Sequence, residues 1–205
     1  MAQNIQGAKL SEFSGKDHFF WLGSADQELD QIELFLTGEL RGHASDRVLA
    51  TILFTDIAGS TPLAVELGDA RWRELLERFY AMARVQLQRF RGRELDTAGD
   101  GLFAAFDGPA RAIRCTEAVR VGARTLGVDV RAGAHTGECE VIEGKLGGIA
   151  VHIAARIAAQ AEPGEILVSS TVKDLVAGSG IAFEDRGMRA LKGLPADWRL
   201  HAVRS

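Results

Sequence analysis

At 205 residues and 22.1 kDa, the chain is long enough for one full domain and a smaller segment, but two complete domains would be cramped. Its composition, 46% hydrophobic and 25% charged, predicts a packed core and not a disordered chain. A formal net charge of −4 gives no basic surface for nucleic acid, and no apolar run approaches the roughly 18 residues of a membrane span. With no signal-peptide pattern at the N-terminus, we expect a soluble, cytoplasmic protein without nucleic-acid or membrane partners.

Residues 1–42 differ from the rest of the chain and are predicted to form a separate N-terminal segment. Ser24 begins a capping-box pattern, and apolar residues then repeat at helical spacing up to Gly38, which predicts one amphipathic helix. The segment resembles the C-terminal end of an α/β-hydrolase, in which a loop with the catalytic histidine, here His18, precedes the last helix. No nucleophile elbow of the form GxSxG precedes His18, so we predict no hydrolase activity and interpret His18 as an exposed loop residue beside a docking helix.

Residues 43–205 are predicted to form a second, larger domain in which strands and helices alternate. Its first expected elements are a strand over 48–55, a helix capped by Thr61, and a longer helix from Asp69 to Gly92. A hairpin over 92–106 and a helix from Pro109 to Leu126 follow. The chain then continues with two strands over 128–142 separated by a glycine, a helix from about Ile149, a strand, a short helix and three terminal strands. This order predicts an α+β protein with a ferredoxin-like βαββαβ sheet and extra C-terminal strands.

Two acidic residues stand out in the first strand and in the hairpin. Asp56 lies in LATILFTDIAGST and Asp100 in LDTAGDGLFAAF, each beside an apolar strand and an adjoining glycine. This pattern is typical of a carboxylate held at the end of a buried strand next to an open backbone. Carboxylate oxygens are preferred ligands of Mg²⁺ and Mn²⁺, so the pair is a candidate metal site.

The motifs FTDIAGST, TAGDG and AVHIAAR occur in this order and are followed by AEPGEILVS. With these motifs, residues 48–203 resemble the catalytic domain of class III nucleotide (adenylate/guanylate) cyclases, of the bacterial type joined to an α/β-hydrolase-like domain. The resemblance implies the nucleotide cyclase fold, a homodimer with active sites at the interface, and two divalent cations, Mg²⁺ or Mn²⁺. The positions that match the metal site are Asp56, Ile57 and Asp100. Those that match the turn over the substrate phosphates are Gly59, Ser60 and Thr61.

Two residues of the AVHIAAR motif, His152 and Arg156, are four positions apart and therefore share one helix face. Arg156 matches the family arginine that stabilises charge in the transition state, a role suited to a permanent planar cation. His152 stands where the family usually has an asparagine that orients the ribose. Its ring N–H can still donate a hydrogen bond, or the residue is a packed helix-face histidine. In the family the arginine comes from the other subunit, so a monomer would have no complete site.

Base recognition is where the sequence departs most from the family. Adenylate cyclases commonly have a lysine four residues before the second metal aspartate and an aspartate seven before the ribose asparagine, whereas this chain has Asp96 and Lys145 there. The exchanged pair can read adenine with swapped targets, read guanine, or form a salt bridge that reads nothing. Relatives with the same AVHI histidine cyclise ATP, so we predict an adenylate cyclase that converts ATP to 3′,5′-cyclic AMP and pyrophosphate. The alternatives are a guanylate cyclase that uses GTP and a degenerate domain that binds nucleotide and regulates.

Overall fold

The computed structural model describes Leu10 and residues 26–38, 47–142 and 145–204. The chain divides into two compact units, Met1–Ser45 and Asp46–Ser205, which are described separately below. In the part of the chain that is described, no helix is both long and apolar enough to cross a membrane. The predicted cap Ser24 and the loop histidine His18 lie outside the described residues.

The described part of the first unit is mainly one helix, α1 (Asp26–Thr37). It ends at Thr37, directly before Gly38 as predicted, and the N–H of Gly38 donates to the carbonyl of Leu34 at 3.0 Å. The predicted helix is therefore confirmed. The apolar residues exposed along it are Leu29, Ile32, Phe35 and Leu36.

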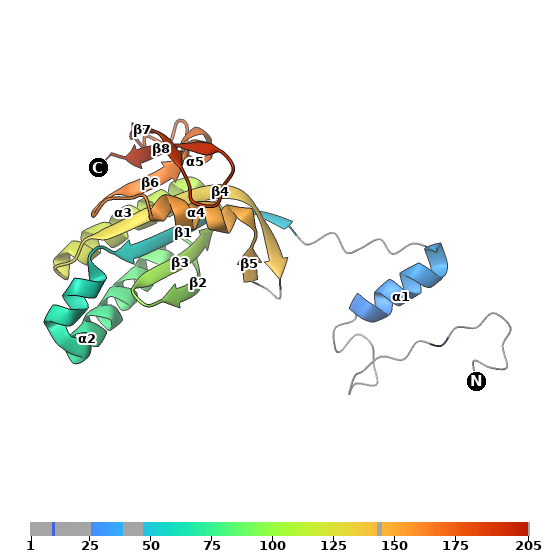
Figure 1. The fold of residues 1–205 in the computed structure, drawn as a ribbon, viewed down its shortest axis with the longest axis horizontal. Helices are drawn as coiled ribbons and strands as arrows, with labels where there is room; N and C mark the ends of the chain where they lie inside the picture. The colour runs from blue at the N-terminus through green and yellow to red at the C-terminus, as the bar shows by residue number, and fades with distance from the viewer. Residues whose placement is uncertain (1–9, 11–25, 39–46, 143–144, 205) are drawn as a thin grey trace. The chain divides into compact units, whose positions relative to one another are not determined.

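The second unit is built on one mixed sheet (Figure 1). Its described strands are β1 (Arg47–Ile57), β2 (Arg93–Ala98), β3 (Gly101–Phe106), β4 (Val130–Ile142), β5 (Lys145–Gly147), β6 (Ile166–Ser169), β7 (Phe183–Ala190) and β8 (Asp197–Val203). The strand order is β2-β3-β1-β4-β6-β8-β7, and the short β5 pairs with β4. Neighbouring strands are antiparallel except for β4 and β6, which are parallel. The strands β1 to β4 and their two helices form the predicted ferredoxin-like βαββαβ arrangement, and the later strands extend it.

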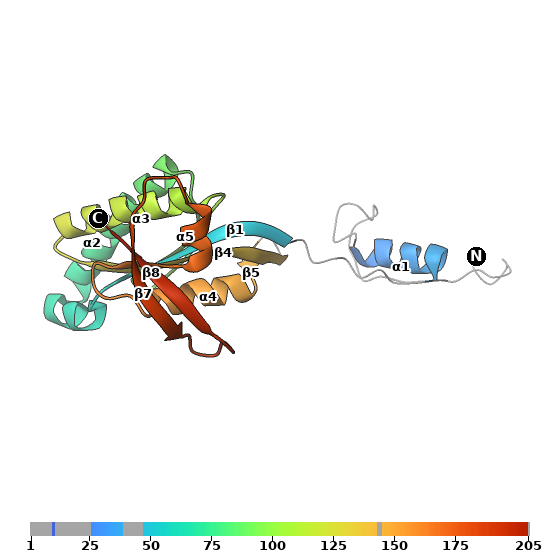
Figure 2. The same ribbon diagram turned by 90° about the horizontal axis from the view of Figure 1, so that it is seen from above.

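Helices cover both faces of this sheet (Figure 2). On one face, α2 (Ser60–Arg89) and α3 (Pro109–Thr125) share a core with the sheet, and the short α5 (Ser170–Leu175) joins them there. On the other face, α4 (Ile149–Ala158) packs against β1, β4 and β6. The helix α2 is interrupted at Gly68, where the predicted short helix and the predicted longer helix meet.

The side chains of β1 alternate between the two faces, as expected for a pleated strand. Leu53 and Ile57 pack in the core formed with α2 and α3, whereas Ile52 and Phe54 belong to the core formed with α4. By the same alternation, the carboxylate of Asp56 lies on the α4 face. The strand is thus buried on both sides over its central residues, as predicted, and carries one acid near its C-terminal end.

The close packing of α4 on the sheet depends on a glycine in β4. A Cβ atom at Gly133 would lie 2.1 Å from the backbone nitrogen of Ala158 and 2.5 Å from its Cα atom. A side chain at this position would therefore push α4 away from the sheet. Gly133 sets the distance between helix and strand, and it does not end the strand.

Two predictions about the later elements are wrong. Residues 128–142 hold one strand and not two, because β4 pairs with β1 in an uninterrupted register from Val130 to Glu140. Two strands, and not three, end the described chain, because residues 191–196 form a turn between β7 and β8. The strand β5, which pairs with the end of β4, was not predicted.

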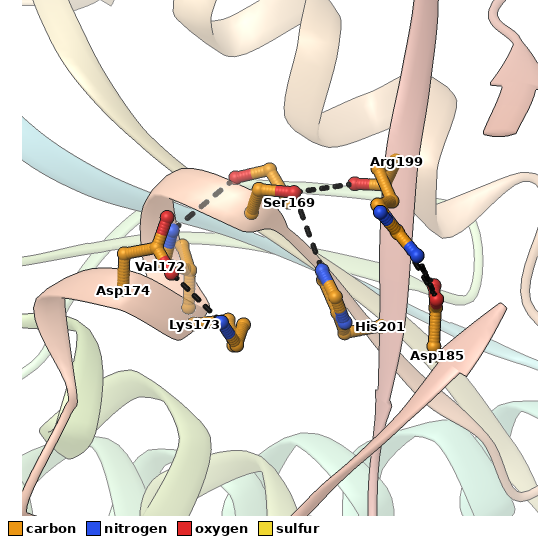
Figure 3. A network of polar contacts seen from close by, with 8 residues as sticks. Ser169, Val172, Lys173, Asp174, Asp185, Arg199 and His201 are labelled. Carbon is orange, nitrogen blue, oxygen red and sulfur yellow. Dashed lines mark hydrogen bonds and ion pairs between the residues drawn. The ribbon is translucent and has the colours of Figure 1, made fainter. Parts of the chain in front are cut away.

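Polar contacts fasten this C-terminal hairpin to α5 (Figure 3). The hydroxyl of Ser170 donates to the carbonyl of Arg199 at 3.2 Å and also lies 3.2 Å from Nε2 of His201. The guanidinium of Arg199 in turn pairs with Asp185 of β7, with Nε 3.1 Å from Oδ2, and holds the pKa of that carboxyl well below its usual range. This network stabilises the strands that extend the sheet.

Candidate active site

Asp56, the penultimate residue of β1, is bound by an arginine of the neighbouring strand. It lies directly opposite Arg131 of β4 in the antiparallel register. The Nε and Nη2 groups of Arg131 both donate to one carboxylate oxygen of Asp56, Oδ2, at 3.1 and 2.6 Å. The pair is only partly buried, with 39% of the Arg131 side chain and 31% of the Asp56 side chain exposed. The carboxylate is therefore both paired and accessible.

Asp100 lies in the turn between β2 and β3, close to Asp56. Tyr80 of α2 supports this turn, because its hydroxyl donates to the carbonyl of Gly99 at 2.8 Å. Burial raises the pKa of Asp100, and the neighbouring carboxyl of Asp56 raises it further, whereas a hydrogen bond from Ser60 lowers it. The buried Oδ2 atom of Asp100 has no hydrogen-bond partner. The two acids thus face each other with one carboxylate oxygen unsatisfied.

These groups fit a divalent cation. A buried carboxylate oxygen without a donor is costly unless a cation reaches it, and a cation near both acids would relieve their mutual repulsion. Ile57 can add only its backbone carbonyl, since its side chain is buried in the core at 1% exposure. No group of three or more His, Cys, Asp or Glu side chains that could hold a metal ion is found among the described residues. A bound ion would therefore take its remaining oxygen ligands from the backbone, water or substrate.

The turn from β1 into α2 borders a cavity of about 500 Å³. Gly59, with a φ of 68°, is the N-cap of α2, and no side chain caps the helix. The predicted cap at Thr61 is therefore wrong: the helix begins at Ser60, because Gly59 already turns the chain. The free N–H groups of a helix start favour an anion. Gly59, Ser60 and Thr61 all border this cavity, and so does Arg131.

A second, more apolar cavity of about 300 Å³ is bordered by β1, β3 and α4. Phe54 and Phe103 stack on its wall with ring centroids 4.5 Å apart. The charged residues along it are Asp56, Arg131 and Asp96, of which Asp96 is exposed at a bulge in β2. The cavity combines flat apolar walls with a carboxylate acceptor, which suits a planar ring that carries N–H donors.

The structure does not bring His152, Arg156 and Lys145 to these cavities. His152 and Arg156 lie on the exposed face of α4, and Lys145 is exposed in β5. None of the three borders either cavity. Within the described part of the chain, Asp96 and Lys145 form no ion pair, so one subunit gives no support to the salt-bridge alternative.

Arg131 and Tyr80 are the residues of this site that the sequence analysis missed. Arg131 had only a weak signal, because its strand also contains Glu138 and Glu140, which pair with Arg47 and not with this site. Tyr80 had none, because it follows the helical apolar repeat of α2 and its contact with the turn exists only in the folded chain.

Comparison with known sequences gives a family match over most of the chain. Residues 43–204 match the profile of the family described as "Adenylate and Guanylate cyclase catalytic domain". The chain is 29% identical over 164 residues to "Putative adenylate cyclase 3" of Rhizobium meliloti, covering 72% of this chain and 27% of that protein. It is 31% identical over 137 residues to an uncharacterized protein of Mycobacterium tuberculosis, covering 66% of this chain and 36% of that protein. The chain thus spans about a quarter to a third of the length of these relatives.

Solved structures share the fold. The adenylyl cyclase CyaB from P. aeruginosa aligns with a TM-score of 0.72 at 24% identity, covering 78% of this chain and 95% of that chain. The guanylate cyclase domain of RhGC from Catenaria anguillulae, in complex with GTP, aligns with a TM-score of 0.70 at 17% identity, covering 78% and 98%. The adenylate/guanylate cyclase/hydrolase from Silicibacter pomeroyi aligns with a TM-score of 0.66 at 26% identity, covering 78% and 98%. The α+β sheet described above is the fold of these proteins.

Proposed function

Because the chain belongs to the adenylate and guanylate cyclase catalytic domain family, we propose that residues 43–205 convert ATP to 3′,5′-cyclic AMP and pyrophosphate. The observation that carries this proposal is the facing pair of Asp56 and Asp100, whose unsatisfied oxygen lies close to the uncapped start of α2. A cation site beside an anion site is what a nucleoside triphosphate requires. Residues 1–42 form a separate segment in this proposal, which resembles the end of an α/β-hydrolase.

In the proposed mechanism, Asp56 and Asp100 would hold Mg²⁺ or Mn²⁺ together with the carbonyl of Ile57. Two such ions, when bound, would activate the ribose 3′-hydroxyl and neutralise triphosphate charge. The N–H groups of the turn at 59–61 bind phosphate oxygens, and Arg131, on the same cavity, adds a planar cation for them. The 3′-hydroxyl oxygen then attacks the α-phosphorus in line, its proton passes to water, and the bond to pyrophosphate breaks.

A homodimer with shared sites would give a role to the residues that one subunit leaves outside its cavities. His152 and Arg156 share the exposed face of α4. A second copy that presents this face to the acidic pair would bring Arg156 to the charge of the transition state and His152 to the ribose. Asp96 and Lys145 would then approach the base.

Guanylate cyclase activity is the second candidate, and the exposure of Asp96 favours it. The carboxylate accepts hydrogen bonds only, and guanine offers donors at both N1 and N2, whereas adenine offers donors at N6 alone. The solved relatives are described both as adenylyl and as guanylyl cyclases. The ratio of the rates with the two purines therefore decides between the candidates.

A turnover assay with both nucleotides tests the proposal. The full chain is incubated with Mn²⁺ and either ATP or GTP, and the products are separated by chromatography. We expect cyclic AMP from the wild type and a loss of at least about 100-fold in Asp56→Asn, which keeps the size of the side chain and removes its charge. Asp107→Asn is the matched control, because Asp107 is an exposed aspartate that pairs with Arg111 away from both cavities.

The possible results separate the alternatives. Cyclic GMP formed faster than cyclic AMP would favour the guanylate cyclase, and nucleotide binding without any product would favour a regulatory domain. Full activity in Asp56→Asn would reject the metal assignment. A mixture of Asp56→Asn and Arg156→Ala subunits, each inactive alone, should recover activity if the sites are shared, and no recovery would argue against the homodimer.

A further inference from the structure

The carboxylate that we assign to a cation is also the acceptor of two hydrogen bonds from Arg131. Both N–H groups are directed at the same oxygen, Oδ2 of Asp56, and the strand register places the two residues directly opposite each other. The contact is therefore built into the pairing of β1 with β4. It is not an incidental meeting of two long surface side chains.

A guanidinium and a divalent cation on one carboxylate repel each other. The repulsion is strong at contact distance in a partly buried place, where solvent screens it less than in bulk water. Asp100 offers the cation an unsatisfied oxygen, whereas one oxygen of Asp56, Oδ2, accepts both hydrogen bonds from Arg131 and leaves Oδ1 beside the guanidinium. A cation shared by both acids would therefore bind Asp56 next to the guanidinium charge, and the repulsion between the two charges favours release of the guanidinium from Oδ2.

Arg131 has space to move away. Its side chain is 39% exposed, and it borders both the cavity beside the α2 turn and the cavity beneath α4. The guanidinium can leave Asp56 for either cavity without becoming a buried, unpaired charge.

We propose that Arg131 is a positioning residue that competes with the divalent cation for Asp56, so that cation binding is coupled to release of its guanidinium. The inference rests on the assignment of Asp56 as a cation ligand under the proposed function. Arg131 then lowers the affinity for the cation alone and holds Asp56 in place when no cation binds.

Binding of Mn²⁺ in the absence of nucleotide tests this inference. Free Mn²⁺ is titrated by electron paramagnetic resonance with the full chain and its variants. We expect Arg131→Gln to bind Mn²⁺ about 10-fold more tightly than the wild type, because it removes the competing charge. Arg131→Lys keeps the charge and should stay within about threefold of the wild type. Arg199→Gln is the matched control, since Arg199 also pairs with an aspartate on the neighbouring strand, far from the acidic pair in the sheet order, and should leave the affinity unchanged (Figure 3).

Thermal unfolding gives a readout that a purely structural role would not produce. Arg131→Gln should unfold at a lower temperature than the wild type without Mn²⁺, and saturating Mn²⁺ should raise its unfolding temperature by more than it raises that of the wild type. A variant that had only lost a structural contact would show the first effect without the second.

The inference is overturned if Arg131→Gln binds Mn²⁺ no more tightly than the wild type, if neither protein binds it, or if Arg131→Lys gains as much as Arg131→Gln. Its failure is distinguishable from that of the proposed function. A wild type that makes no cyclic nucleotide while Arg131→Gln still gains Mn²⁺ affinity would reject the activity and keep the competition. If the wild type is an active cyclase and Arg131→Gln shows no gain in Mn²⁺ affinity, the activity is kept and the competition is rejected.

Discussion

Replacing Gly133 by alanine is expected to destabilise the second unit strongly, because the added methyl group would meet the backbone of α4. Its Cβ atom would lie 2.1 Å from the nitrogen of Ala158 and 2.8 Å from the Cβ of that residue. Non-bonded heavy atoms pack best at about 3.5–4.0 Å, so helix and strand would have to separate by roughly 1 Å or more. Overpacking a core usually costs about 1–3 kcal/mol. Since no side-chain rotation relieves this contact, we expect a loss of about 3 kcal/mol or more.

Urea unfolding followed by circular dichroism measures the free energy of unfolding of this variant and of the wild type. Gly147→Ala is the matched control, because its Cβ would meet nothing nearer than the Cδ1 atom of Ile142 at 3.8 Å, and we expect it within about 0.5 kcal/mol of the wild type. An unchanged m-value makes the free energies comparable. A loss below about 1 kcal/mol in Gly133→Ala would show that α4 shifts easily, and would refute the claim that this glycine sets its distance from the sheet.

Two further predictions concern polar groups inside the second unit. Burial lowers the pKa of His135 from 6.5 to about 4, so between these values the unfolded chain binds a proton that the folded protein does not. The free energy of unfolding should therefore fall as the pH decreases through this window, by roughly 3 kcal/mol in total. Urea unfolding at pH 7 and pH 5 measures about 2 kcal/mol of this fall, and an equal fall in His135→Gln would contradict this origin. Tyr80→Phe removes the hydroxyl that contacts the carbonyls of Gly99 and Gly101 at 2.8 and 3.2 Å, and should cost about 1 kcal/mol of stability. It should also weaken Mn²⁺ binding, because Asp100 lies in that turn, and an unchanged Mn²⁺ affinity would show that the turn holds Asp100 without the tyrosine.

The first half of the second unit was predictable because each of its elements has a local signal. The apolar run before Asp56 predicts a strand buried on both faces, the glycine-flanked turn at Asp100 predicts a hairpin, and Pro109 marks the start of α3. These signals depend only on neighbouring residues in the sequence, and the elements that they predict are present in the structure. The two acids found in the motifs consequently lie close together, as the motifs suggest.

The features that were predicted wrongly or missed depend on contacts between distant segments, for which the sequence has no clear local signal. A glycine in residues 128–142 was interpreted as a break, but Gly133 serves the approach of α4 and the strand continues through it. The start of α2 was placed two residues too late because Thr61 is a common cap, whereas Gly59 turns the chain without a side chain. Arg131 was missed because its position opposite Asp56 depends on which strands are neighbours in the sheet. The spacing of residues in the sequence does not give this strand order.

The pairing of Asp56 with Arg131 also places a condition on how the chain acquires its acidic site during synthesis. The two residues are 75 positions apart, and α2, β2, β3 and α3 all lie between them. A nascent chain that ends before β4 already contains Asp56 and Asp100, yet the strand that neutralises one of them has not been made. Contacts of such large sequence separation form late, because loop closure must come first. The acidic pair therefore cannot reach its folded arrangement before β4 has been made, and translation that pauses before residue 131 would leave two like charges near an unfinished sheet edge.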